Sequence, residues 1–198
     1  MTARWTTSAI ALTLGAALAG CAHLPHGGDQ RTYAERREYL AGLDAWDLRG
    51  RIAIRNGDEA FQGRFLWAQR PDGLALTVRS PLGTNVLRIS GPPQQLKLEA
   101  RGETRDLEDP EPQLSELVGW WLPVTSFRSW LLGIPDPTYD ASERVGGDGV
   151  LDSLQQRLWN LSYSSYQLTA GVLVPRRIDL KHAQLDLRVI VDSWSPAP

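Results

Sequence analysis

The feature that most constrains the fold of this chain is an alternation of apolar and polar residues that recurs between turn signals. Within 46–55 (WDLRGRIAIR), Trp46, Leu48 and Ile52 fall on one face of an extended chain, and charged residues fall on the other. A period of two is typical of a β-strand with one buried face. The residues NGDE at 56–59 are a strong hairpin signal, and the alternation returns over 61–67. The folded part is therefore expected to begin as antiparallel strands.

Further strands are expected along most of the chain, with one helical interruption. They cover the ranges 74–78, 86–90, 96–100, 159–163, 178–180 and 185–191. Apolar residues at helical spacing predict helices over 33–44 and within 109–132, whereas GGDG at 146–149 predicts a loop. We therefore predict a mainly β fold of about ten or eleven antiparallel strands that curls towards a barrel and is covered by helices.

The first twenty residues have the features of a signal peptide. Arg4 precedes an uncharged, largely apolar stretch at 5–18, which is too short to span a membrane comfortably. LAGC at 18–21 resembles a lipobox, in which Cys21 becomes the lipid-modified first residue. A single unpaired thiol is unusual in an oxidising compartment, and lipid attachment would consume it. Cleavage after ALA at 17–19, which would release a secreted soluble protein, is the alternative.

The predicted organisation has three parts. Residues 1–20 form the signal peptide, residues 21–32 form a lipid-anchored flexible tether, and residues 33–198 form a single domain. Ala22 follows the cysteine where an aspartate would favour retention in the inner membrane. We therefore expect anchoring by the Cys21 lipid at the periplasmic face of the outer membrane. The tether histidines, His23 and His26, lack further ligands and are not expected to bind a metal.

The sequence contains no motif that predicts catalysis or cofactor binding. It has neither a Gly-x-Ser-x-Gly elbow nor a phosphate-binding loop, and no cluster of His, Cys and Asp has metal-ligand spacing. His182 lies in a predicted turn, where a solvated side chain is the simplest interpretation. A net charge of −2 without a long basic run argues against nucleic acid. We expect no enzyme activity, no cofactor and no metal, although remote paired carboxylates would be compatible with a lipid-anchored hydrolase.

One turn carries an unexpected residue. In SPLG at 80–83, Pro81 and Gly83 bracket Leu82, which places a large apolar side chain at the tip of a turn. A leucine left in water forgoes about 1.5–3 kcal/mol of burial free energy. Turn chemistry therefore gives no reason for Leu82.

Six stretches of the chain resemble one protein family. In order they are DLRGRIAIR, FLWAQR, SPLGTNVLRI, LVGWWLPVTSFRSWLLGIPDP, LWNLSYSSY, and VPRRIDL followed by LDLRVIVDSW. With LAGC, they resemble the LolB family of outer-membrane lipoprotein receptors over about residues 47–194. The resemblance implies a half-open β-barrel that is lidded by helices and encloses an apolar cavity.

The resemblance also implies a function. Members of this family accept lipoproteins from the periplasmic carrier LolA, hold their acyl chains in the cavity and insert them into the outer membrane. Their partners are therefore the carrier, acylated lipoproteins and outer-membrane lipids, and a monomer is expected. A protruding Pro-Leu-Gly loop, which matches Pro81, Leu82 and Gly83, is implicated in insertion. Transfer without a nucleotide site must run downhill from carrier to receptor to bilayer.

The apolar residues of the expected strands and helices are candidates for the cavity wall, although each could equally be packed core. Those of the strands are Leu48, Ile52, Phe65, Trp67, Leu76, Val78, Trp159, Leu161, Tyr163, Ile178, Leu180, Leu187 and Val189, and those of the helices are Leu117, Trp121 and Trp130. The alternative function is a lipid-anchored binding or scaffold module of the cell envelope that performs no transfer.

Overall fold

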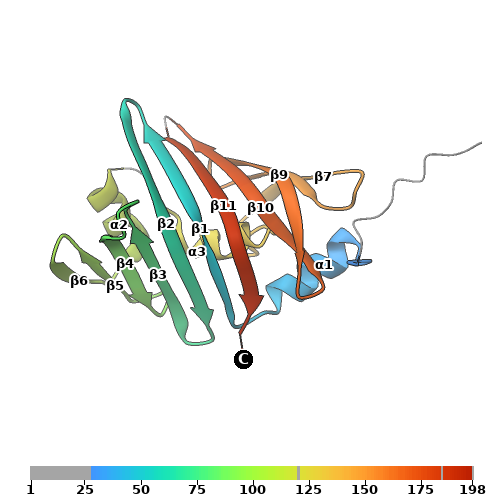
Figure 1. Cartoon of the computed structure of the whole chain (residues 1–198), viewed down its shortest axis with the longest axis horizontal. Helices are drawn as coiled ribbons and strands as arrows, with labels where there is room; N and C mark the ends of the chain where they lie inside the picture. The colour runs from blue at the N-terminus through green and yellow to red at the C-terminus, as the bar shows by residue number, and fades with distance from the viewer. Residues whose placement is uncertain (1–27, 120, 184, 198) are drawn as a thin grey trace, which may run out of the picture.

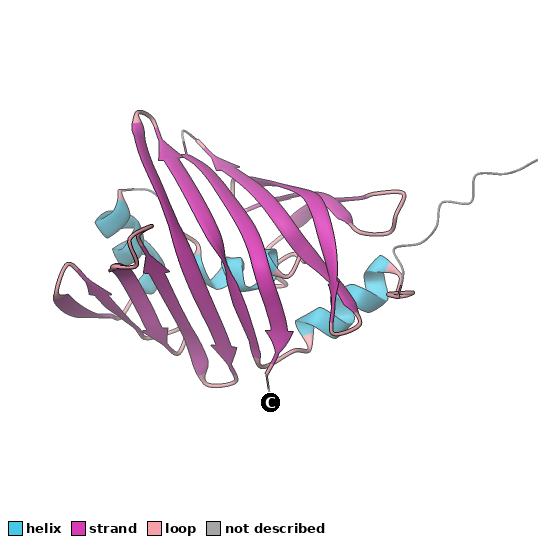
Figure 2. Cartoon of the chain, in the orientation of Figure 1, coloured by secondary structure: helices cyan, strands magenta, loops and turns pink. Residues whose placement is uncertain are grey.

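The computed structural model of the chain describes residues 28–119, 121–183 and 185–197. In these residues, eleven strands form one antiparallel sheet that is accompanied by three helices (Figures 1 and 2). The strands are β1 (Trp46–Asn56), β2 (Glu59–Arg70), β3 (Gly73–Arg79), β4 (Asn85–Gly91), β5 (Leu96–Ala100), β6 (Glu103–Leu107), β7 (Ala141–Val145), β8 (Leu151–Gln156), β9 (Trp159–Thr169), β10 (Val172–His182) and β11 (Leu185–Pro196). The helices are α1 (Tyr33–Ala41), α2 (Pro110–Val118) and α3 (Val124–Leu131).

The sheet is an open meander. Its order is β6-β5-β4-β3-β2-β1-β11-β10-β9-β8-β7, so the pairing of β1 with β11 joins two halves and leaves β6 and β7 as edges. The connection between those edges contains α2 and α3, which lie behind the sheet in Figure 1. The predicted fold, a mainly β half-open barrel with a helical lid, is confirmed.

The connections between strands fall at two ends of the sheet because strand direction alternates. The β1–β2, β3–β4, β5–β6, β8–β9 and β10–β11 connections lie at one end, which we call the β1–β2 end. The remaining hairpins, β2–β3, β4–β5, β7–β8 and β9–β10, lie at the opposite end, which we call the β2–β3 end. The expected NGDE hairpin joins β1 to β2, and Gly57 adopts a φ of +59° there. A glycine adopts this left-handed conformation without steric cost.

Three strands were not expected from the sequence. Four of the five residues of β6 are exposed, and β7 has no buried residue, so neither edge strand shows an apolar face. In β8 the buried residues are Leu151, Leu154 and Gln156, which do not alternate with a period of two. The expected loop at 146–149 is confirmed, and it is the turn between β7 and β8.

Helix α3 packs against the second half of the sheet. Its Trp130 ring lies 5.4 Å from the ring of Phe127 and 6.1 Å from that of Trp159 in β9, measured between centroids. The indole Nε1 of Trp130 donates a 2.8 Å hydrogen bond to Oε1 of the buried Gln156. The apolar face of α3 is thus packed into an aromatic core. No helix in the described residues is long and apolar enough to cross a membrane.

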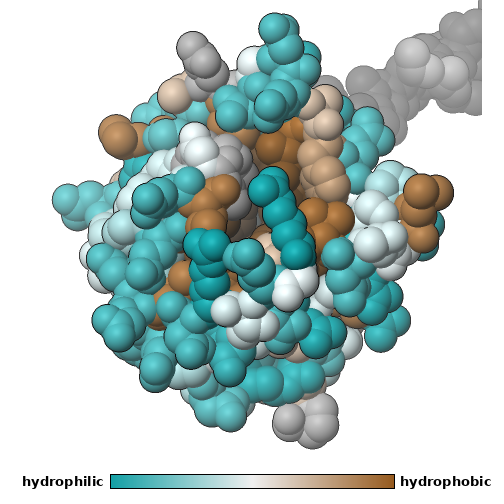
Figure 3. All heavy atoms as spheres, turned by 90° about the vertical axis from the view of Figure 1, so that its left-hand side faces the viewer, coloured by the Kyte–Doolittle hydropathy of each residue, from teal (hydrophilic) through white to brown (hydrophobic). Residues whose placement is uncertain are grey.

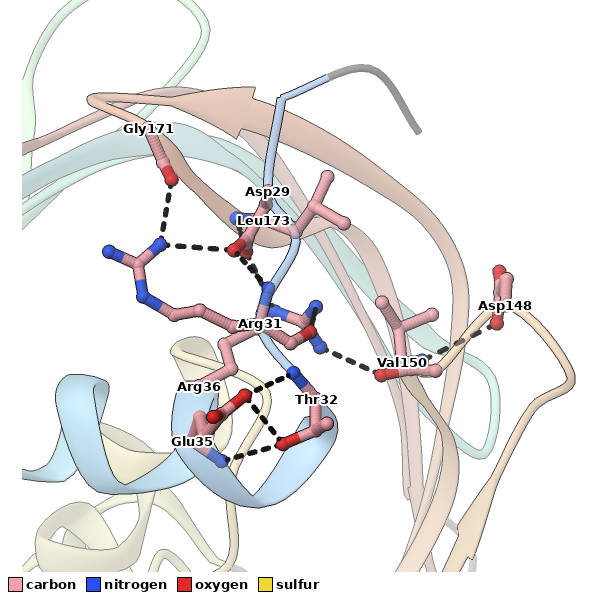
Figure 4. Close-up of polar contacts among 10 residues, drawn as sticks. Asp29, Arg31, Thr32, Glu35, Arg36, Asp148, Val150, Gly171 and Leu173 are labelled. Atoms are coloured by element: carbon pink, nitrogen blue, oxygen red, sulfur yellow. Dashed lines mark hydrogen bonds and ion pairs between the residues drawn. The ribbon is translucent and has the colours of Figure 1, made fainter. Parts of the chain in front are cut away.

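The N-terminal segment is attached to the sheet at Asp29, as Figure 4 shows. The buried Asp29 carboxylate accepts hydrogen bonds from the backbone N–H of Leu173 at 2.8 Å and from Nε of Arg36 at 2.9 Å. Arg31 donates to the same carboxylate, and Thr32 forms a capping box with Glu35 at the start of α1.

These contacts correct the expectation that residues 21–32 form a flexible tether, because residues 29–32 belong to the folded domain. The hydrogen bonds that the buried Asp29 carboxylate accepts replace those that it would make with water in a free tether. The predicted signal peptide (1–20), Cys21, His23 and His26 lie outside the described residues.

Candidate functional site

An apolar cavity of about 700 Å³ lies between the sheet and helices α2 and α3. Its strand wall comes from β1 to β6 together with β11, and its helical wall includes Leu114, Val124 and Phe127. Alternation along each strand directs every second side chain towards the same face, which explains how one half of the sheet supplies a continuous apolar wall.

The cavity opens at the β1–β2 end. Most of the polar and exposed strand residues that line it lie near this end, and Glu59, Arg101 and Glu103 are among them. Figure 3 shows an apolar hollow bordered by hydrophilic side chains. An opening of this kind gives an apolar ligand access while the surrounding surface stays in water.

Half of the residues predicted for the cavity wall line this cavity. They are Ile52, Phe65, Trp67, Leu76, Val78, Leu117, Leu187 and Val189. The other half are not among the lining residues. These are Leu48, Trp121, Trp130, Trp159, Leu161, Tyr163, Ile178 and Leu180, of which Trp121 is half-buried and the rest are fully packed in the core.

The division has a physical cause. Most of the packed residues come from β9 and β10, where the space under the sheet is filled by α3. Tyr163, for example, donates a hydrogen bond from its hydroxyl to the backbone carbonyl of Trp130 at 3.1 Å. In the first half of the sheet, Leu48 is packed in the core, whereas Phe65, Leu76 and Val78 face the cavity.

Several lining residues were not predicted from the sequence. Ile54 and Phe61 face each other in the β1–β2 register, and both continue the alternation that identified Ile52 and Phe65. Val124, Phe127 and Leu131 line the cavity from one face of α3, at spacings of three and four residues. Both patterns were present in the sequence and needed only to be extended.

Arg157 holds the two lid helices to the sheet. From the β8–β9 turn, its guanidinium donates to the Glu111 carboxylate in α2 at 2.6 and 3.0 Å and to Ser126 Oγ in α3 at 3.1 Å. The side chains of Arg157 and Glu111 are only 11% and 13% exposed. Burial alone would lower the pKa of Arg157, but the hydrogen bonds and charge of Glu111 raise it above its usual value.

Leu82 lies where the sequence predicted, at the tip of the β3–β4 connection. Hydrogen bonds from Ser80 N–H to the Thr84 carbonyl and from Gly83 N–H to the Ser80 carbonyl, both 2.9 Å, close the turn. The Leu82 side chain is 94% exposed. It therefore projects into solvent at the same end of the sheet as the cavity opening.

His182 corrects a smaller expectation. Its ring stacks on Trp159 at 5.1 Å, so it is half-buried against the core rather than solvated in a turn. In the part of the chain that the structure describes, no group of three or more His, Cys, Asp or Glu residues could hold a metal ion.

Comparison with known sequences gives one consistent family. A family model described as "Outer membrane lipoprotein LolB" matches residues 44–194. The outer-membrane lipoprotein LolB of Pseudomonas fluorescens Pf-5 is 35% identical over 191 residues, which cover 96% of this chain and 93% of that protein. The LolB of Pseudomonas putida GB-1 is 34% identical over 194 residues, which cover 94% of this chain and 95% of that protein.

Solved structures show the same fold at low sequence identity. A LolA superfamily protein from Nitrosomonas europaea superposes with a TM-score of 0.54 at 8% identity, over 85% of this chain and 94% of that one. A DUF1329 family protein from Desulfovibrio piger superposes with a TM-score of 0.50 at 9% identity, over 83% of this chain and 90% of that one. An open sheet with helices on one face is therefore shared by chains that differ widely in sequence.

Proposed function

This chain belongs to the LolB family of outer-membrane lipoproteins, and on that premise we propose that it receives lipoproteins from a LolA-type carrier and inserts them into the outer membrane. The observation that carries the proposal is the apolar cavity between the sheet and the lid helices, which opens at one end. Such a receptor binds and releases its ligand without chemical change, so the protein is not an enzyme.

The cavity matches the chemistry of an acyl chain. Each methylene group removed from water is worth about 0.8 kcal/mol, so a chain of about a dozen gains about 10 kcal/mol on entering an apolar site. A lining of leucine, isoleucine, valine and aromatic side chains provides that environment and offers no strong hydrogen bonds to retain the ligand. The acyl chain can therefore leave again when a bilayer takes its place.

Two residues, Cys21 and Leu82, would place the receptor at the membrane. The lipid on Cys21 keeps the monomeric receptor at the periplasmic face of the outer membrane, where a carrier can reach it. Leu82 touches the bilayer when the ligand leaves. One leucine gains only about 0.5 kcal/mol on membrane-insertion scales, so it is a local contact and not an anchor.

A handover assay tests the function. The mature chain is mixed with a carrier that is loaded with a tagged lipoprotein, and the two proteins are separated after incubation without ATP. The proposal predicts that the tag moves to this chain. A tag that remains on the carrier, while circular dichroism shows this chain folded, would contradict the proposal and favour a binding module without transfer.

A further inference from the structure

A second leucine lies at the tip of a turn, in the β8–β9 connection. Leu158 is 86% exposed, and among the described residues only Leu82 exceeds it in the set of exposed large apolar side chains. The next most exposed members of that set, Leu117 and Leu168, reach 44%. Leu82 and Leu158 are therefore about twice as exposed as any other large apolar side chain in the described residues.

The backbone of this turn gives no structural reason for a leucine. Arg157 and Leu158 have φ values of +52° and +66°, in the left-handed region that residues with side chains usually avoid. Two-residue hairpins of this kind favour Asn-Gly because both positions need a positive φ. The contacts of Arg157 with Glu111 and Ser126 explain why an arginine occupies the first of these positions. Leu158 has almost its whole side chain in water, so packing does not compensate its strained backbone.

The position of the turn relates Leu158 to the cavity. The β3–β4 and β8–β9 connections both lie at the β1–β2 end, at which the cavity opens. Leu82 belongs to the hollow half of the sheet and Leu158 to the filled half, with β2, β1, β11 and β10 between their strands β3 and β9. The two leucines thus stand at the same end, on the two halves of the half-barrel.

The Leu158 tip is also held firmly. On one side, Arg157 is fixed by the largely buried ion pair with Glu111, and its guanidinium lies 4.1 Å from the ring centroid of Tyr139. On the other side, Trp159 is buried in the aromatic core. A side chain between two fixed neighbours can meet a surface with little further loss of conformational entropy.

These observations favour a bilayer over a protein as the surface that Leu158 meets. A stable protein interface needs about 800 Å² of contiguous surface on each partner, whereas Leu82 and Leu158 are single tips separated by strands. A bilayer accepts individual apolar side chains, and the chain belongs to a family of outer-membrane lipoproteins. We propose that Leu158 is a second bilayer contact, which together with Leu82 brings the cavity opening against the lipid surface. This inference rests on the proposed function.

Site-specific labelling tests the contact directly. Because Cys21 is the only cysteine of the chain and its thiol is consumed in the lipoprotein, Leu158→Cys gives a unique site for an environment-sensitive fluorophore. The labelled mature protein is placed on vesicles of phosphatidylethanolamine and phosphatidylglycerol with brominated acyl chains. We expect quenching at positions 158 and 82 and none for Asp72→Cys, which lies in the β2–β3 turn at the opposite end.

Quenching at 82 but not at 158 would overturn the proposal. Shielding of a label at 158 by the loaded carrier and not by vesicles would also overturn it, because Leu158 would then contact a protein and not a bilayer. The quenching measurement needs no ligand. It therefore still decides the role of Leu158 if the wild-type chain takes no lipoprotein from the carrier and the proposed function itself fails.

A pair of substitutions separates contact from packing. Leu158→Gly removes the apolar group and suits the positive φ, so we expect an unchanged or higher Tm together with delivery to vesicles reduced about twofold, the loss of one leucine contact. Leu158→Met keeps an apolar side chain and should keep delivery. Undiminished delivery by Leu158→Gly, or a Tm lowered by several degrees, would show that Leu158 is not a bilayer contact.

Discussion

At the scale of single residues, environment decides what each side chain contributes. Leu82 is surrounded by water, and its neighbours in the turn hold it there through backbone hydrogen bonds rather than side-chain packing. Asp29 is in the opposite situation, since its carboxylate is buried and hydrogen-bonded by Leu173, Arg36 and Arg31. A substitution at Leu82 should therefore change function alone, whereas one at Asp29 should change stability.

Leu82→Glu should block delivery and leave the fold and ligand uptake intact. A leucine gains about 0.5 kcal/mol in a membrane, whereas a charged group costs up to about 3 kcal/mol, so insertion of this tip becomes strongly unfavourable. We expect delivery from the preloaded receptor to vesicles to fall at least about tenfold. Leu82→Met serves as the apolar control. An unfolded variant, or one that takes no lipoprotein from the carrier, would show that Leu82 is a packing residue.

Asp29→Asn should lower stability in a way that depends on pH. Burial alone would raise the pKa of Asp29, but the hydrogen bonds from Leu173, Arg36 and Arg31 lower it from 3.8 to about 2. A depressed pKa stabilises the folded state fully above the unfolded-state value, and this stabilisation is lost as the pH falls through the folded-state value. We expect the free energy of unfolding of the wild type to exceed that of Asp29→Asn by about 2 kcal/mol at pH 7.

Urea denaturation at a series of pH values measures this difference. It should be constant above about pH 5 and shrink as the pH falls from about 4 towards 2. Asp72→Asn, at an exposed turn, is the control. A difference that does not change with pH would mean that the charge of Asp29 is not what attaches the N-terminal segment.

At the scale of elements, the ion pair between Arg157 and Glu111 links helix α2 to the sheet, and little of either side chain is exposed. Glu111→Gln should leave the Arg157 charge buried without its partner, which costs about 3 kcal/mol in such a setting. Because Glu111 also accepts a hydrogen bond from the Thr125 hydroxyl, α2 and α3 should loosen together. We expect a lower Tm and faster hydrogen exchange in 110–131.

A surface pair provides the matched control. Arg88 and Glu99 are 3.9 Å apart across β4 and β5, with about half of each side chain exposed. Glu99→Gln should change stability by less than about 0.5 kcal/mol. Equal effects of the two substitutions would contradict the account of the lid.

The elements also show where sequence reasoning succeeds. Strands β1 to β5 combine regular alternation with clear turn signals such as NGDE, and they were predicted close to their observed bounds. Strands β6 and β7 are short, polar edges whose stability comes from pairing with β5 and β8, a tertiary effect that leaves no apolar period in the sequence. The same is true of Asp29, whose partners Leu173 and Arg36 are set by the fold.

At the scale of the whole molecule, the half-barrel divides into a filled half and a hollow half. An apolar side chain such as Ile178 or Val78 looks the same in the sequence whether it meets a core or a cavity. The position of α3 determines which of the two a side chain meets, because Trp130 of α3 fills the space beneath β9. The sequence could therefore predict a wall of apolar residues, but only the packing of the lid shows which of them line the cavity.

The most direct test of the account is to locate the acyl chain inside the protein. A lipoprotein that carries a diazirine on its acyl chain is transferred from the carrier to the mature chain and irradiated, and the adducts are mapped by mass spectrometry. We predict adducts on the hollow half and its lid, at residues such as Phe65, Val78, Leu98 and Val124. Adducts confined to the filled half, at Tyr163 or Ile178, or confined to the outer surface would contradict this prediction.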